Sequence, residues 1–112
     1  MTSPITTHIL DINLGQPASG VPVTLEIQSE GDWKELGTGT TNADGRVTDL
    51  LDGPITGGVY RITFDTGSYF RATNTKAFYP SVSVTFAVAD GGEHYHVPLL
   101  LSPHGYSTYR GS

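Results

Sequence analysis

The sequence predicts an all-β domain with one short helix. Hydrophobic and polar residues alternate with a period of two in segment after segment, and turn residues recur about every ten residues, a spacing typical of a β-sandwich or β-barrel. Glycine (14) and proline (7) are abundant and only 15% of the residues are charged, which favours turn-rich β structure over a helical protein. At 112 residues, a single domain spanning residues 1–112 is the natural count.

Four strands are predicted in the first half of the chain: residues 5–11, 21–27, 33–41 and 46–50. A loop over residues 15–20 separates the first two strands, and Glu30-Gly31-Asp32 forms a hairpin turn between the second and the third. The next turn contains Asp44-Gly45, a pair favoured in tight turns because glycine adopts positive φ without steric cost. The fourth strand therefore begins at Arg46.

The second half is predicted to hold one helix, over residues 66–74, and four more strands: residues 59–65, 82–88, 93–101 and 106–110. The helix is assigned because Tyr69, Phe70 and Thr73 recur at helical spacing, and Thr66 is a candidate N-cap. Clusters of glycine, proline and small polar residues separate the strands. With these elements the count comes to about eight strands, which again indicates a sandwich or a barrel.

The composition argues against several classes of function. The net charge is −5 with no basic run, so the electrostatic footprint of a nucleic-acid-binding protein is missing. No apolar stretch approaches the ~18 residues of a membrane span. Residues 1–4 lead into the first strand without a charged and then apolar export segment. The chain has no cysteine, which removes disulfides, thiolate metal sites and thiol catalysis, and a small chain without disulfides is expected in the cytoplasm.

Four histidines and a few polar residues are left as candidates for chemistry. His94 and His96 are two apart on a predicted strand, so both face the side opposite Tyr95. With a third histidine nearby such a pair could bind zinc, but two exposed histidines on a sheet are commoner than a metal site. His8 shares a partly apolar face with Thr6, an arrangement typical of a packed histidine. Taken singly, none of these residues identifies a site.

Arg46 and Ser112 are equally ambiguous by themselves. An arginine directly after a tight turn is by default a solvated surface residue, and a serine at the end of a sequence is by default disordered in water. Two tyrosines and an arginine among the last seven residues are unusual for such a segment. These residues therefore indicate either a sticky tail or a tail that is built into a site.

Three motifs in order resemble those of the transthyretin-like family. The segment HILD at residues 8–11 resembles the N-terminal motif of that family. The segment YHVPLLLSP at residues 95–103 resembles its second motif. The segment YRGS at residues 109–112 is similar to the ending that marks the branch of the family that hydrolyses 5-hydroxyisourate. The resemblance spans nearly the whole chain; one departure is His104, where the family more often has an aromatic residue.

This resemblance implies an eight-stranded transthyretin-like sandwich with one short helix, assembled as a homotetramer of two-fold dimers. It implies active sites in a channel between dimers, with no metal or other cofactor. The catalytic residues it implies are His8, His96 and Arg46. The residues implied to bind substrate are Arg46, Tyr109, Arg110, Gly111 and Ser112. The hormone carriers of the same fold lack the final tetrapeptide and have other residues at positions 8, 46 and 96.

The reaction implied is hydrolysis of 5-hydroxyisourate to 2-oxo-4-hydroxy-4-carboxy-5-ureidoimidazoline in urate degradation. Histidine, with an ordinary pKa of ~6.5, suits a general base near neutral pH. Two histidines on strands ~4.8 Å apart can share a water, so we expect His8 and His96 to activate it. The planar donors of Arg46 suit ureide carbonyls and a developing oxyanion. Arg110 and Ser112 are expected to complete the pocket wall, and Tyr109 to pack rather than react.

Three alternatives stay open. A non-catalytic carrier would bind a small aromatic ligand in the tetramer channel without converting it. A zinc hydrolase would use His8, His94 and His96 and would lose activity to a chelator. An adhesion or carbohydrate-binding sandwich fits the fold but would normally carry an export segment.

Overall fold

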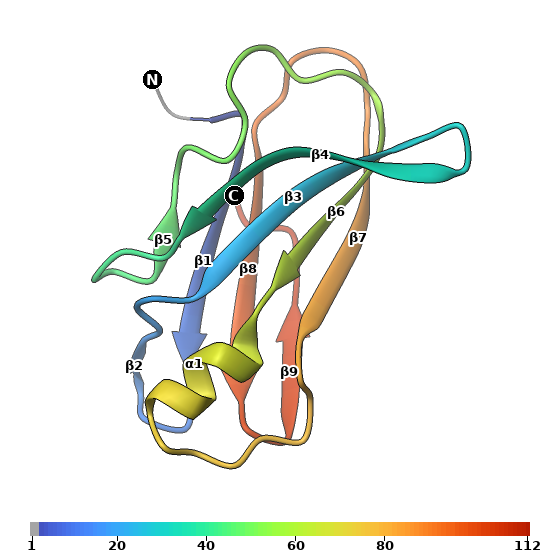
Figure 1. Cartoon of the computed structure of the whole chain (residues 1–112). Coiled ribbons are helices and arrows are strands. Elements are labelled where there is room, and N and C mark those ends of the chain that lie inside the picture. Colours follow the sequence, from blue (N-terminus) through green and yellow to red (C-terminus); the bar gives the residue numbers. More distant parts are fainter. Residues whose placement is uncertain (1–2) are drawn as a thin grey trace.

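A computed structural model describes residues 3–112; Met1 and Thr2, the start of the segment predicted to lead into the first strand without an export sequence, lie outside the described residues. The chain forms two β-sheets packed face to face, with one helix at one end (Figure 1). The elements are β1 (Ile5–Asp11), β2 (Gln16–Pro17), β3 (Pro22–Ser29), β4 (Asp32–Thr40), β5 (Arg46–Val47), β6 (Gly58–Phe64), α1 (Thr66–Ala72), β7 (Val82–Val88), β8 (Tyr95–Ser102) and β9 (Gly105–Thr108). The predicted all-β class is confirmed, as a sandwich.

The two sheets differ in how they are built. One contains β4, β3, β6 and β7 in that order, all antiparallel. The other contains β2, β1, β8 and β9 in order, with β5 also paired to β1. Within this second sheet β1 and β8 run parallel, so the first strand lies beside one that starts 90 residues later in the sequence. That pairing places Ile5–Asp11 next to Tyr95–Leu101.

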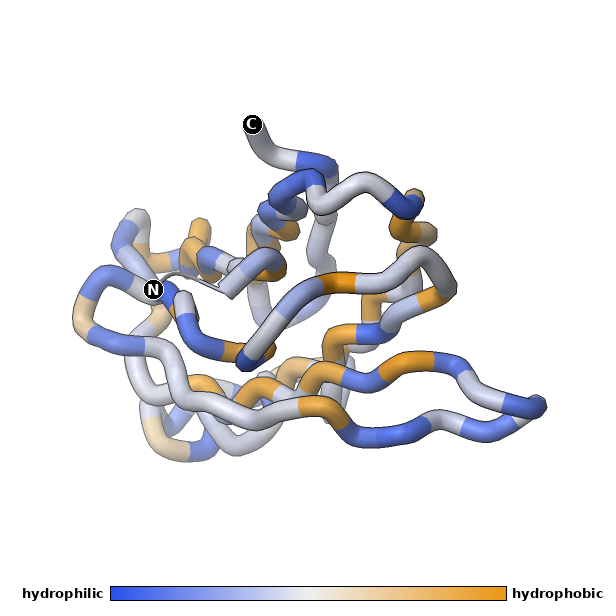
Figure 2. The backbone as a smooth tube through the Cα atoms, turned by 90° about the horizontal axis from the view of Figure 1, so that it is seen from above, coloured by the Kyte–Doolittle hydropathy of each residue, from blue (hydrophilic) through white to orange (hydrophobic). Residues whose placement is uncertain are grey.

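The core lies between the sheets and consists of alternate residues of the facing strands. The largest fully buried side chains include Tyr60, Phe64, Ile5, Ile9, Leu25, Ile62, Leu99 and Leu101. Burying an aliphatic or aromatic side chain of this size contributes about 1.5–3 kcal/mol. In Figure 2 the hydrophobic stretches gather in the middle of the molecule, and the projecting end of the β3–β4 hairpin is hydrophilic. The predicted period-two faces therefore correspond to the buried faces.

Most predicted strands other than β1 and β7 are shifted by one or two residues at an end, and two regions differ more from the prediction. The loop predicted over residues 15–20 contains β2, a two-residue strand that pairs with the end of β1. The strand predicted over residues 46–50 ends at Val47, because the chain then turns inward and buries Leu50 against Gly37, where a side chain would collide with the Leu50 carbonyl. Beyond Val47, Ser3 provides hydrogen bonds to this segment in place of strand pairing. Its backbone N–H donates to the Thr48 carbonyl at 2.8 Å, and its Oγ accepts from the Leu51 N–H at 3.0 Å.

The predicted helix is confirmed, but its N-cap was assigned one residue too late. Asp65 is the N-cap, since its carboxylate accepts a hydrogen bond from the Ser68 N–H at 3.0 Å, and Thr66 is the first helical residue. Tyr69 and Phe70 face the core, whereas Thr73, the third residue of the predicted helical spacing, is exposed. The Tyr69 hydroxyl donates to Asp11 Oδ2 at 2.6 Å, which fastens α1 to the end of β1. Within residues 3–112, no helix is long and apolar enough to span a membrane.

Candidate active site

The outer face of the β1–β8 pair carries the histidines. On β1, Thr6 and His8 alternate with core residues and point outward. On β8, Tyr95 and Val97 are buried in the core while His96 between them is half-buried, which confirms the predicted split of that segment into two faces. Because the strands are in register, Thr6 lies directly opposite His96.

A tight turn places Arg46 beside His8. The Asn42 side chain holds the turn, since its Oδ1 accepts from the N–H groups of Asp44 at 2.9 Å and Arg46 at 3.0 Å. Gly45 has a φ of +74° and lies so close to the Ile9 carbonyl that a side chain would not fit. Arg46 is then the cross-strand partner of His8. Arg46 is exposed, and no carboxylate of residues 3–112 lies within 4.0 Å of its guanidinium.

The last residues return to β8 and complete the same surface (Figure 1). β9 ends at Thr108, two residues earlier than predicted, but Gly111 pairs with His96 through a hydrogen bond from its N–H to the His96 carbonyl at 2.8 Å. A Cβ on Gly111 would lie 2.6 Å from Cδ2 of the His96 ring. Only glycine therefore fits against the imidazole, and Ser112 follows it into the cavity.

Tyr109 and Arg110 lie on another side of the tail. The Arg110 guanidinium lies over the Tyr95 ring, 4.5 Å from its centroid, and 3.9 Å from Glu93 Oε1. Tyr109 is 57% exposed. Both residues line a separate cavity of about 330 Å³ that includes Val97. Within one chain, the tail thus contributes Ser112 and Gly111 to the histidine surface, and Tyr109 and Arg110 to a different one.

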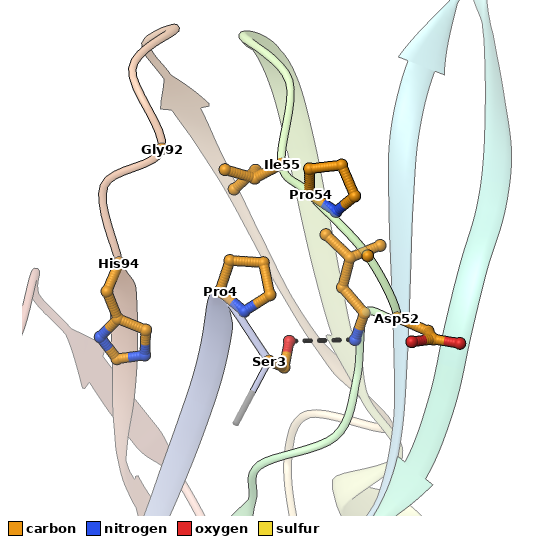
Figure 3. A pocket seen from close by; sticks show the side chains of 9 residues that line it. Ser3, Pro4, Asp52, Pro54, Ile55, Gly92 and His94 are labelled. Atoms are coloured by element: carbon orange, nitrogen blue, oxygen red, sulfur yellow. Dashed lines mark hydrogen bonds between the residues drawn. The ribbon is translucent and has the colours of Figure 1, made fainter. Parts of the chain in front are cut away.

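Two cavities meet at His94, and they differ in chemistry. The larger, about 620 Å³, is lined mainly by apolar groups such as Pro4, Leu51 and Ile55 (Figure 3). Its polar Ser3 hydroxyl is already engaged with backbone N–H groups. The smaller, about 370 Å³, is lined by Thr6, Arg46, Thr48, His94, His96 and Ser112. Convergent donors and titratable groups mark the smaller cavity as the candidate active site.

Both histidines of the predicted pair are held toward their neutral form. Burial and then the Arg46 charge lower the pKa of His8, against an opposing effect of Asp44. Burial, the Arg46 charge, His8 and His94 lower the pKa of His96, in that order. A positive neighbour and partial burial both disfavour the imidazolium ion. At neutral pH the two rings are therefore available to accept a proton.

Sequence reasoning did not assign Thr6 or Thr48 to the site, and it considered His94 only as a zinc ligand. Thr6 Oγ1 lies 2.8 Å from His96 Nδ1 and 3.1 Å from His94 Nε2. The alternation on β1 places Thr6 on the same face as His8, but the contact itself depends on the pairing with β8. Among the residues that the structure describes, no three histidine, aspartate or glutamate side chains are grouped as the ligands of a metal ion would be.

Comparison with known proteins gives two kinds of likeness. A sequence model of the HIUase/Transthyretin family matches residues 5–111. The 5-hydroxyisourate hydrolase 2 of Rhizobium meliloti is 48% identical to this chain, over 96% of this chain and 95% of its own length. The structure of Klebsiella pneumoniae 5-hydroxyisourate hydrolase matches with a TM-score of 0.86 at 37% identity, covering 96% of this chain and 98% of that one.

A second solved structure represents the other branch of the fold. Sea bream transthyretin in complex with thyroxine matches with a TM-score of 0.92 at 33% identity, covering 97% of this chain and 95% of that one. The backbone therefore resembles both kinds of protein, while the sequence is more similar to the hydrolases.

Proposed function

The chain belongs to the HIUase/Transthyretin family, and from that membership we propose that it hydrolyses 5-hydroxyisourate to 2-oxo-4-hydroxy-4-carboxy-5-ureidoimidazoline in urate degradation. The observation that carries the proposal is the shared cavity of Arg46, His96 and Ser112. His8 does not line this cavity, but it is the cross-strand partner of Arg46. His8 and His96, whose pKa values are lowered, lie near Arg46, which has no carboxylate partner among residues 3–112. A hydrolase that works at neutral pH needs a neutral base to activate water and a positive charge to stabilise the developing oxyanion.

The residues divide the reaction between them. His96, with His8 beside it, takes a proton from a water whose oxygen bonds to the acyl carbon of the six-membered ring. Arg46 stabilises the negative charge that develops on the carbonyl oxygen. When the intermediate collapses, the acyl C–N bond breaks and the ring nitrogen receives the proton from the imidazolium ion. The product then carries a new carboxyl group, which loses its proton to solvent at neutral pH, and a ureido group, and the base is neutral again.

The tail has two roles in this proposal. Gly111 covers one edge of the His96 ring, and Ser112 supplies a hydroxyl to the cavity wall. Tyr109 and Arg110 face away from the cavity of their own chain, so they contact substrate where another copy completes the site. The active site thus includes the four residues Tyr109, Arg110, Gly111 and Ser112, contributed in part across an interface.

A homotetramer of two-fold dimers would provide that interface. Apolar side chains are exposed at the β1–β2 loop, where Ile12 is 52% and Leu14 54% exposed. Near the β8–β9 turn, Tyr79 packs edge-on between Phe78 and Tyr106, at 4.9 and 5.3 Å between ring centroids. Exposed apolar patches of this kind mark association surfaces. We place the assembly in the cytoplasm, because a chain without cysteine suits a reducing compartment.

One assay tests the function directly. The purified protein is added to 5-hydroxyisourate freshly made by urate oxidase, and the ultraviolet absorbance of the substrate is followed against its spontaneous decay. We expect accelerated decay that a chelator does not suppress. Binding of the compound without acceleration would support the carrier instead, and loss of activity with chelator would support the zinc hydrolase. Sedimentation of the same sample measures the oligomeric state.

A further inference from the structure

We propose that Thr6 is a positioning residue that fixes the ring orientation and the tautomer of His96, through a hydroxyl group that His96 shares with His94. This inference rests on the proposed function, since it assigns His96 the role of base.

The Thr6 hydroxyl is held between the two rings. Thr6 is 5% exposed, and its Oγ1 lies 2.8 Å from Nδ1 of His96 and 3.1 Å from Nε2 of His94. The parallel register of β1 and β8 places Thr6 directly opposite His96, so the contact is built into the sheet. A β-branched side chain also has few χ1 choices in a strand, which keeps the hydroxyl in place.

The contacts leave one nitrogen of His96 for chemistry. Nδ1 is engaged by Thr6, and Gly111 lies against the Cδ2 edge of the ring. Of the two nitrogens, Nε2 is therefore the one free to meet a water in the cavity that His96 lines with Arg46 and Ser112. To act as a base, Nε2 must carry a lone pair, so the proton of the neutral ring must reside on Nδ1.

The shared hydroxyl is compatible with this tautomer, because it can donate to one ring and accept from the other. A threonine hydroxyl donates one hydrogen bond and can accept others. When it donates to Nε2 of His94, it can only accept from His96, whose Nδ1 must then carry the proton. In this arrangement His94 accepts the single hydrogen bond that the Thr6 hydroxyl can donate. Thr6 then cannot donate to His96. The result is an Nδ1–H tautomer with Nε2 directed at the substrate.

The neighbouring Thr7 provides a matched control. Thr7 is also buried, but it faces the core, and its hydroxyl donates to the Val97 carbonyl at 2.6 Å. The variants Thr6→Val and Thr7→Val each remove one buried hydroxyl from adjacent positions of β1. A loss that reflects only weaker packing would be similar in both. A loss through His96 would appear only in the first.

The test combines kinetics with nitrogen NMR on protein carrying ¹⁵N-labelled histidine. We expect Thr6→Val to lower kcat by about 10–100-fold with little change in KM, because a misplaced base slows chemistry more than binding. The ¹⁵N shifts of His96 should move from the Nδ1–H toward the Nε2–H tautomer. Thr6→Ser, which keeps the hydroxyl, should restore both readouts, and Thr7→Val should change neither.

Several outcomes would overturn the proposal. An unchanged kcat and an unchanged His96 tautomer in Thr6→Val would show that the hydroxyl does not position the ring. If Thr6→Val does not fold, Thr6→Ser and Thr6→Ala provide the same comparison. If the unmodified protein does not act on 5-hydroxyisourate, the proposed function fails, but the NMR measurement still decides whether Thr6 sets the tautomer. An Nε2–H tautomer of His96 in the unmodified protein would contradict the inference directly.

Discussion

Each sheet carries an arginine on its outer face, and the two differ in whether a carboxylate pairs with them. Arg61 of the four-stranded sheet donates from Nε at 2.9 Å and from Nη2 at 2.8 Å to Oε1 of Glu26, its cross-strand partner. Its guanidinium also lies over the Trp33 ring, 4.2 Å from the centroid. Arg46 of the other sheet faces His8 and has no carboxylate partner among residues 3–112.

The difference separates a structural charge from a functional one. The Arg61 charge is paired with Glu26, and its Nε and Nη2 donors are engaged there, so it has less to offer a ligand. The Arg46 guanidinium has no carboxylate partner among residues 3–112, and its charge acts on the histidines instead, where it adds to burial in lowering their pKa values. An unpaired charge that perturbs neighbouring titratable groups in a cavity is what an active site requires.

Removal of residues 109–112 should have the largest effect. We expect the truncated protein to fold but to lose measurable hydrolase activity, because the Ser112 wall and the cover over the His96 ring disappear together. Circular dichroism checks the fold, and the absorbance assay checks the activity. Full activity in the truncated chain would show that residues 109–112 are not part of the active site that we assign to Arg46.

His96→Asn should follow, with kcat lower by about 10²–10⁴-fold, the range expected when a positioned acid–base group is lost. Asparagine keeps a polar side chain of modest size on the outer face of β8, so the fold should be retained. His104→Asn is the matched control, since His104 is exposed in the β8–β9 turn. Unchanged turnover in His96→Asn would show that this residue does not transfer the proton.

Arg46→Gln should lower kcat/KM by about 10²–10³-fold, as for the loss of a donor to a developing oxyanion. Its pH dependence should change as well. Without the positive charge, the pKa values of His96 and His8 rise toward their ordinary value, although burial still lowers them. The acid limb of the pH profile should therefore move to higher pH. A limb that stays in place would show that Arg46 does not act on the base.

Gly111→Ala should cost less, up to about 10²-fold in kcat, because the added methyl group displaces the His96 ring without removing it. The substitution leaves the length of the tail and Ser112 intact. Its partner for comparison is Ser112→Ala, which removes only the hydroxyl. A Gly111→Ala protein with normal activity would mean that the ring has room to move within the assembled site.

Arg61→Gln should have the smallest effect on function. We expect normal kcat and KM, with a loss of unfolding free energy of about 1 kcal/mol or less, since the pair with Glu26 is partly exposed to solvent. Urea denaturation measures the stability. A loss of activity comparable to that of Arg46→Gln would break the contrast between the two sheets.

Much of the local structure could be predicted from the sequence. The spans of β1 and β7 agree residue for residue with the predicted 5–11 and 82–88. In β7 this follows from the strict alternation of hydrophobic residues, which is a local signal. The end of β5 could not be predicted, since it depends on the burial of Leu50 against Gly37 of another strand. The N-cap was misplaced because Asp65 and Thr66 are both suitable residues, and the path of the chain decided between them.

The sequence by itself determined which residues face outward and, through its ordered motifs, which family the chain resembles. It could not show how those residues meet. Thr6 and Thr7 are adjacent and identical, yet one contacts two histidines and the other a carbonyl in the core. Only the parallel pairing of β1 with β8 decides this, because a shift of one residue would exchange the two faces. Contacts between residues 90 positions apart depend on the register of the assembled sheet, which no local pattern specifies.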